Sequence, residues 1–128
     1  MTTYREAHVG GEDPLAITVS LDVVRKRRGT PKWFVAVEDH VVYSTESVSM
    51  AEETMDAIVR TVEALLMDLH GFGRCDHCDE VKSDVRLYRV EYRSPHGKVG
   101  EFKEHLCSSC LDAVRADGDT LSCKEVPA

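Results

Sequence analysis

The sequence contains two cysteine pairs of the form C-x-x-C, at Cys75 and Cys78 and at Cys107 and Cys110. Two cysteines separated by two residues can bind one ion from a single turn of the chain, and a second such pair completes a tetrahedral shell of sulfur ligands. We therefore predict that these four cysteines bind one Zn²⁺. A shell of four cysteines has no open position for water or substrate, which favours a structural ion over a catalytic one.

The number of cysteines leaves a second interpretation open. Five cysteines could also form two disulfides with one thiol left over. The chain shows no apolar stretch near its N-terminus that is typical of a signal peptide, and no run of about 18 or more apolar residues that could span a membrane. We therefore expect a cytoplasmic protein that keeps its thiols reduced and does not bind a membrane.

The segment around the cysteines has a regular order of expected elements. A tight knuckle at 75–78 is followed by a strand at 84–93, a turn at 94–97, a return strand that reaches Cys107, and a helix that ends near Gly118. Knuckle, β-hairpin and a short helix that opens with the second C-x-x-C are the arrangement of treble-clef zinc fingers, which residues 75–118 resemble. The resemblance implies the same four cysteines as ligands. His77 and His105 lie close enough in sequence to replace a cysteine, but an intact set of four makes this unnecessary.

The first half of the chain predicts a small sheet and a helix. Apolar and polar residues alternate over 15–23, and shorter apolar runs follow at 33–37 and 41–43. From Ser49 to His70 the apolar residues recur at helical spacing. We predict an α+β protein, in which residues 1–14 form a loose lead-in, residues 15–71 form a three-stranded antiparallel sheet with one long helix, and residues 72–128 form the treble-clef zinc module.

A second resemblance concerns the N-terminal half alone. A short meander followed by a helix that opens in Ser-Met-Ala-Glu-Glu, over residues 15–70, resembles HicB-type antitoxin domains. In that family such a unit binds the toxin, so the resemblance implies a protein partner. In an antitoxin-like protein the other half would bind an operator.

A basic loop in the N-terminal half is the main candidate for contacts with phosphate. It could neutralise backbone charges of a nucleic acid while a neighbouring indole stacks on a base; the candidate residues are Arg25, Lys26, Arg27, Arg28, Lys32 and Trp33. Arg86, Arg89 and Arg93 could line one edge of the later hairpin. The alternative is a solvated turn whose charges keep a sheet edge from pairing with its neighbours. The formal net charge of -7 disfavours nucleic acid overall.

Motifs of catalysis are absent from the sequence. There is no glycine-rich phosphate loop, no G-x-S-x-G elbow and no H-E-x-x-H. Cys123 has no motif that supplies a base, so we expect a small buried residue and not a nucleophile. We therefore expect a non-enzymatic, zinc-binding regulatory or adaptor protein that binds a macromolecular partner, most simply a protein. The alternatives are a nucleic-acid-binding regulator or HicB-like antitoxin, and a cysteine-dependent enzyme.

Overall fold

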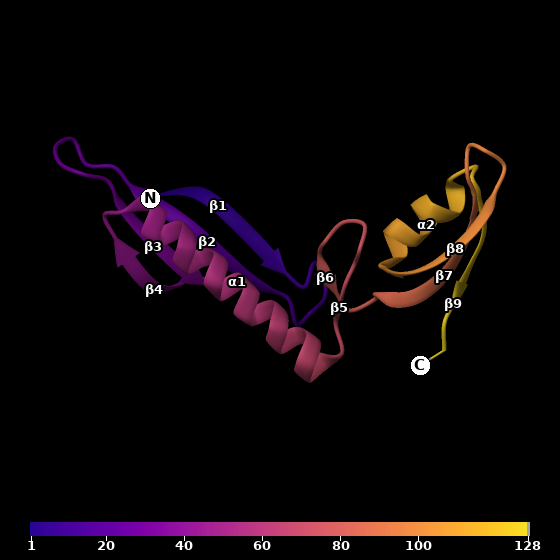
Figure 1. Ribbon diagram of the computed structural model, residues 1–128. Helices are drawn as coiled ribbons and strands as arrows, with labels where there is room; N and C mark the ends of the chain where they lie inside the picture. The colour runs from indigo at the N-terminus through magenta and orange to yellow at the C-terminus, as the bar shows by residue number, and fades with distance from the viewer. Residues whose placement is uncertain (128) are drawn as a thin grey trace. The chain divides into compact units, whose positions relative to one another are not determined.

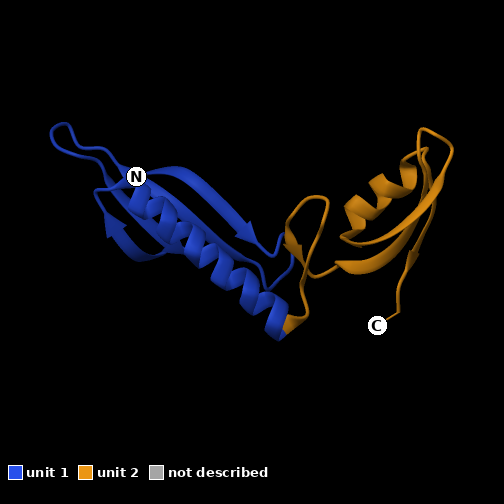
Figure 2. Ribbon diagram, viewed as in Figure 1, with its two compact units in different colours: residues 1–69 blue, residues 70–128 orange. Residues whose placement is uncertain are grey.

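The computed structural model describes residues 1–127 and has an α+β fold. It divides into two compact units, residues 1–69 and residues 70–128, drawn in separate colours in Figure 2. Residue 128, the last residue of the predicted zinc module, lies outside the described residues. The sequence placed the boundary between residues 71 and 72.

The first unit contains a four-stranded antiparallel sheet, which corrects the prediction of three strands. Its strands are β1 (Thr2–Val9), β2 (Ile17–Val24), β3 (Lys32–Val37) and β4 (His40–Thr45), arranged in that order across the sheet (Figure 1). The extra strand β1 lies within residues 1–14, which we predicted as a loose lead-in. β1 is an edge strand in which only Val9 is buried, so its sequence lacks the alternation of apolar residues that identifies a half-buried strand.

The alternation predicted over 15–23 is confirmed within β2, whereas Leu15 lies before the strand and is exposed. Val19, Leu21 and Val23 are almost fully buried, and Val35 of β3 lies opposite Leu21 on the same face. The register between β2 and β3 pairs these apolar positions directly. This face of the sheet forms one side of the core of the first unit.

The helix α1 (Val48–His70) provides the other side of that core (Figure 1). Its buried residues are Ala51, Met55, Val62 and Leu66. The helix begins one residue before the predicted position, because the hydroxyl of Ser47 accepts a hydrogen bond from the amide of Met50 at 3.3 Å. In residues 1–127 no helix is both long and apolar enough to cross a membrane.

The helix and the sheet meet closely at one end. Gly10 has a φ of 98°, and a Cβ at this position would lie 3.2 Å from Leu66 Cδ1 and 3.1 Å from the Cα of Ala16. Glycine is required here both by the left-handed backbone and by the close approach of the helix. An ion pair of 2.9 Å between Arg5 of β1 and Asp56 of α1 also joins the edge strand to the helix.

The second unit contains the cysteines. A two-stranded hairpin of β5 (Gly73–Arg74) and β6 (Val81–Lys82) carries the first pair. A three-stranded sheet follows in the order β8-β7-β9, built from β7 (Arg86–Arg93), β8 (Val99–Leu106) and β9 (Thr120–Glu125). The short helix α2 (Ser108–Ala116) connects β8 to β9. The expected hairpin and short helix are therefore both present, and the strand β9 follows them.

The core of the second unit is small and includes cysteines. It consists of Cys75, Val85, Tyr88, Val90, Leu106, Cys107, Leu111, Val114 and Cys123. Three of these nine residues are cysteines, so part of the interior is made of thiols and not of larger apolar side chains. A unit of this size with such a core needs an additional source of stability.

Candidate metal centre

The four cysteines of the two C-x-x-C pairs meet at one point. The Sγ atoms of Cys75, Cys78, Cys107 and Cys110 all lie within 4.8 Å of one another. Sulfur ligands about 2.3 Å from a zinc ion at tetrahedral angles lie roughly 3.8 Å apart, and the Sγ atoms of Cys78 and Cys107 are 3.9 Å apart. The arrangement therefore fits one tetrahedral ion held by four sulfurs.

The first pair lies on the turn of the β5–β6 hairpin. The amide of Asp79 donates to the carbonyl of Cys75 at 2.9 Å, and the amide of Cys75 donates to the carbonyl of Glu80 at 2.9 Å. Asp79 has a φ of 59°, a left-handed conformation that lets the chain reverse immediately after Cys78. These bonds place the thiols of Cys75 and Cys78 on the same side of the turn.

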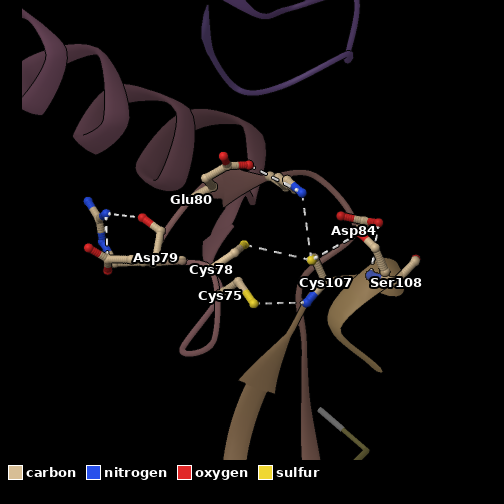
Figure 3. A network of polar contacts seen from close by, with 10 residues as sticks. Cys75, Cys78, Asp79, Glu80, Asp84, Cys107 and Ser108 are labelled. Atoms are coloured by element: carbon tan, nitrogen blue, oxygen red, sulfur yellow. Dashed lines mark hydrogen bonds and ion pairs between the residues drawn. The ribbon is translucent and has the colours of Figure 1, made fainter. Parts of the chain in front are cut away.

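The first pair is brought to the second by contacts with β8. The amide of Asp76 donates to the carbonyl of His105 at 2.8 Å, and the Asp76 carboxylate accepts from the amide of His105 at 2.7 Å. This reciprocal pair of bonds fixes the knuckle against the end of the strand that leads to Cys107. The amide of Cys107 in turn donates to Cys75 Sγ at 3.5 Å (Figure 3).

The second pair lies at the start of α2. Cys107 is the N-cap residue, and its carbonyl accepts the first helical bond from Leu111 at 2.8 Å. No side-chain bond comes from the cap residue itself. Instead, the carboxylate of Asp84 accepts from the amide of Ser108 at 3.1 Å (Figure 3). The N-terminal end of a helix carries partial positive charge, which favours a thiolate over a thiol at Cys107.

Asp84 also shows the electrostatic effect of this position. Its partial burial raises the pKa, but the hydrogen bonds from Ser108 outweigh that effect and lower the pKa of the Asp84 carboxyl below its usual value. The carboxylate is therefore charged at neutral pH. It accepts the hydrogen bond of the Ser108 amide at the N-terminal end of α2, where the side chain of Cys107 makes no capping bond.

One lysine supplies positive charge to the sulfur cluster. The ammonium of Lys82 lies 3.7 Å from Cys107 Sγ and 3.3 Å from a carboxylate oxygen of Glu80. Partial burial lowers the pKa of Lys82, but the bond to Glu80 and the nearby sulfur of Cys107 outweigh it and raise the pKa. A zinc ion with four thiolates carries a net charge of −2, and the ammonium of Lys82 compensates part of it.

The ionisation of each thiol in the cluster depends on its neighbours. Burial raises the pKa of Cys107, but bonds from the Cys110 backbone and from the side chains of Ser109 and Cys110 lower it to about 6. For Cys110, burial and the neighbouring sulfurs of Cys107, Cys75 and Cys78 raise the pKa to about 12. Once one thiol has ionised, its charge opposes ionisation of the next. A bound cation would offset this repulsion and favour the thiolate form of all four sulfurs.

The two nearby histidines have other contacts. His77 Nε2 lies 3.3 Å from Glu104 Oε1, and His105 Nδ1 lies 3.5 Å from Asp76 Oδ2. In the part of the chain that the structure describes, the clustered ligand atoms at this site are the four sulfurs, without either imidazole.

Cys123 lies in the core of the second unit and is not a member of the four-sulfur cluster. Its side chain is buried, and burial raises the pKa of its thiol. A protonated, buried thiol is a poor nucleophile. These features agree with the expectation of a packing residue.

The basic residues singled out by sequence occupy different environments. Arg25, Lys26, Arg27 and Arg28 are all exposed, in the connection between β2 and β3. Trp33, which we expected as a stacking platform, is buried, and its ring meets that of Tyr4 edge-on with centroids 5.1 Å apart. The indole packs against an edge strand that sequence analysis did not find.

The arginines of the second unit are partly engaged within the chain. Arg89 forms an ion pair of 2.9 Å with Glu101, and Arg86 donates to the carbonyls of Ser83 and Val85. Arg93 lies at the end of β7 beside a cleft described below.

The residues that surround the sulfurs were not apparent from the sequence. Lys82 and Asp84 stand at positions with no periodic pattern or motif, and Asp76 is one of the unspecified positions of the first C-x-x-C pair. Each of the three acts through a residue that is distant in the chain. The one available signal was their charge and their closeness in sequence to a C-x-x-C pair. Because charged residues are common throughout this chain, that signal does not single them out.

Comparisons of the chain with models of protein families, with curated proteins and with solved structures find no match.

Proposed function

We propose that Cys75, Cys78, Cys107 and Cys110 bind one structural Zn²⁺ in a treble-clef module, and that the protein acts without catalysis by binding a protein partner in the cytoplasm. The observation that carries the proposal is the set of four sulfurs within 4.8 Å of one another. A zinc ion in this site has all four positions filled by protein ligands, so it can hold the fold but cannot activate water or substrate. Function is then exerted by the protein surface, in a regulatory or adaptor role.

The sheet-and-helix unit offers the more apolar surface for a partner. Val41 and Val42 on the edge strand β4 are 54% and 55% exposed, and Leu65 and Leu69 on α1 are 50% and 70% exposed. The β4 strand, His40–Thr45, carries no Lys, Asp, Glu or Pro. Native proteins usually protect exposed edge strands with such residues, so an unprotected edge is suited to pairing with a partner.

The metal part of the proposal is tested by substitution with Co²⁺. Four thiolates around Co²⁺ give intense charge-transfer and tetrahedral d–d absorption, and their intensity reports how many sulfurs bind. We expect one metal per chain and a four-sulfur spectrum for the wild type. The Cys110→Ser variant should lose that spectrum, and Cys123→Ser, which removes a thiol outside the cluster, should keep it. A wild-type protein that binds no metal would contradict the proposal.

The partner part is tested by affinity capture from the lysate of the protein's own host. The Val42→Lys variant places a charge on the exposed edge of β4, and the matched control Val99→Lys makes the same change at a residue of β8 that is 61% exposed. We expect a protein captured by the wild type and by Val99→Lys to be lost with Val42→Lys. Equal capture by both variants would exclude the β4 edge as the docking surface.

A nucleic-acid-binding regulator is the second candidate. The observation in its favour is the exposure of residues 25–28 of the basic loop, which Lys32, itself half-buried, follows. The burial of Trp33 removes the expected stacking residue from this surface. If the protein bound nucleic acid through the loop, the affinity would fall steeply with salt. Replacement of all four residues 25–28 by alanine would then abolish the binding.

A further inference from the structure

A cleft in the second unit has no role in the metal centre. It lies between the end of the β7–β8 hairpin and α2, with a volume of about 340 Å³. Val90 of β7 and Val114 of α2 are its buried apolar residues, and Tyr92 and Phe102 are its aromatic ones. The four sulfur ligands are not among its lining residues.

The aromatic wall is built by a specific feature of the hairpin. Tyr92 pairs with Gly100, and a Cβ at position 100 would lie 2.6 Å from the Tyr92 ring. The absence of a side chain at Gly100 therefore lets the tyrosine ring lie over the neighbouring strand. There it packs against Phe102 with ring centroids 5.5 Å apart. Both rings remain partly exposed, at 37% and 42%, so their surfaces are available at the cleft.

The charges that line the cleft are mostly negative. Glu104 lies on β8, two residues beyond Phe102, and Asp117 and Asp119 follow the end of α2. Arg93 is the one lysine or arginine among the lining residues that the structure describes. Three carboxylates against one guanidinium favour a cationic ligand, because opposite charge is attracted most strongly where solvent is partly excluded.

Glu104 has an incomplete set of hydrogen bonds. Its side chain is only 15% exposed, and Oε1 lies 3.3 Å from His77 Nε2. Oε2 is buried and has no hydrogen-bond partner within residues 1–127. A buried carboxylate oxygen without a donor is unfavourable, and such an orphan acceptor in a native protein calls for an explanation. Glu104 lines the cleft, so a donor group that enters the cleft is suited to complete the bonding of this carboxylate.

We propose that this cleft binds an alkyl cation, the ammonium or guanidinium end of a lysine or arginine side chain presented by the protein partner. The apolar stem would lie between Tyr92, Phe102 and Val114, and the cationic group would bond to Glu104. Aromatic rings also attract cations through their faces. The inference rests on the proposed function, because it assigns the chemistry by which a protein partner is recognised.

The test is an NMR titration of the zinc-loaded full chain with three blocked amino acids. The probes are the N-acetyl N-methylamides of lysine, of arginine and of norleucine, the last having the lysine stem without its charge. We expect lysine or arginine to cause saturable shifts of the amide signals of Tyr92, Phe102 and Val114. The norleucine probe should bind at least about tenfold more weakly. Equal binding of all three probes, or no shift at the cleft with any of them, would overturn the proposal.

A matched pair of variants tests whether the carboxylate of Glu104 binds the cationic probe. Glu104→Gln keeps the shape of the side chain and removes the carboxylate, and we expect it to weaken binding of the cationic probe about tenfold. Glu101→Gln removes an equal charge from the same strand, at an exposed residue paired with Arg89, and should bind like the wild type. If both folded variants bound the probe equally, Glu104 would not be the recognition residue and the proposal would be wrong.

Two further measurements separate a variant that fails to fold from a cleft that does not bind the probe. Zinc content and dispersion of the NMR spectrum show whether Glu104→Gln is folded. If it is not folded, the Phe102→Leu variant is used instead, because it removes one ring of the aromatic wall and keeps the carboxylate. This variant should bind the cationic probe about threefold more weakly or worse; unchanged binding would count against the cleft. Failure of the probes on a chain that still captures its protein partner would remove the cleft proposal alone. Binding of the probes without any captured protein would remove the proposed function.

Discussion

Removal of the metal should unfold the second unit while the first unit stays folded. Protein stability is about 0.05–0.15 kcal/mol per residue, so a unit of roughly 60 residues has a free energy of unfolding of about 3–9 kcal/mol with its metal bound. Structural zinc contributes about 10–16 kcal/mol of binding free energy near neutral pH. Even with the highest stability, about 9 kcal/mol, and the lowest zinc contribution, about 10 kcal/mol, the metal-free unit has a negative free energy of unfolding, by about 1 kcal/mol.

The first unit has no comparable dependence on metal. All five cysteines lie between residues 75 and 123, outside residues 1–69. Its own core includes Leu21, Val35 and Met55, which are fully buried. We therefore expect chelation to leave the pairing of β2 with β3 intact.

Amide hydrogen exchange followed by NMR measures both units at once. After treatment with a strong chelator, the amides of β7, which lies at the centre of the β8-β7-β9 sheet, should exchange at rates close to those of an unfolded chain. The amides of β2 and β3 should remain protected. Cys110→Ser in the presence of zinc should reproduce the chelated state, and Cys123→Ser should resemble the loaded wild type. Metal-free protein with β7 amides as protected as in the loaded form would refute the reasoning.

Three other perturbations have defined outcomes. Lys82→Met removes the ammonium 3.7 Å from Cys107 Sγ, and we expect it to weaken zinc binding about tenfold in competition with a chelator. The control Lys103→Met, at an exposed residue of β8, should leave the zinc affinity unchanged. Equal zinc affinities of the two variants would show that Lys82 does not compensate the charge of the thiolates. Asp84→Asn should lower the free energy of unfolding of the zinc-loaded protein by about 0.5–1 kcal/mol in urea titrations. Because the pKa of Asp84 is lowered from 3.8 in the folded state, its stabilisation is complete above that value and is lost only as the pH falls through the lower folded pKa. The loss in Asp84→Asn should therefore be equal at pH 6 and pH 8, and a loss that differs between them would contradict this assignment. Finally, we expect no nucleic-acid binding at low salt; binding that the alanine variant of residues 25–28 abolishes would favour the regulator instead.

The architecture of the second unit was predictable because its elements have local signals. Spacing of the cysteines, turn residues at 94–97 and the apolar spacing of the short helix are each contained within a few neighbouring residues. The alternation in β2 is equally local, since it depends on which face of one strand is buried. For the same reason β1 escaped prediction, because an edge strand with exposed side chains shows no alternation.

The sequence alone identified the four cysteines as a candidate metal site, because C-x-x-C spacing places two sulfurs on one turn whatever surrounds them. Their convergence depends on Asp76 binding the backbone of His105, a contact between residues far apart in the chain. The charge of Lys82 beside Cys107, the burial of Trp33 and the incomplete bonding of Glu104 were likewise decided by the tertiary structure. Each depends on which distant groups come together, and spacing along the chain carries no information about such encounters.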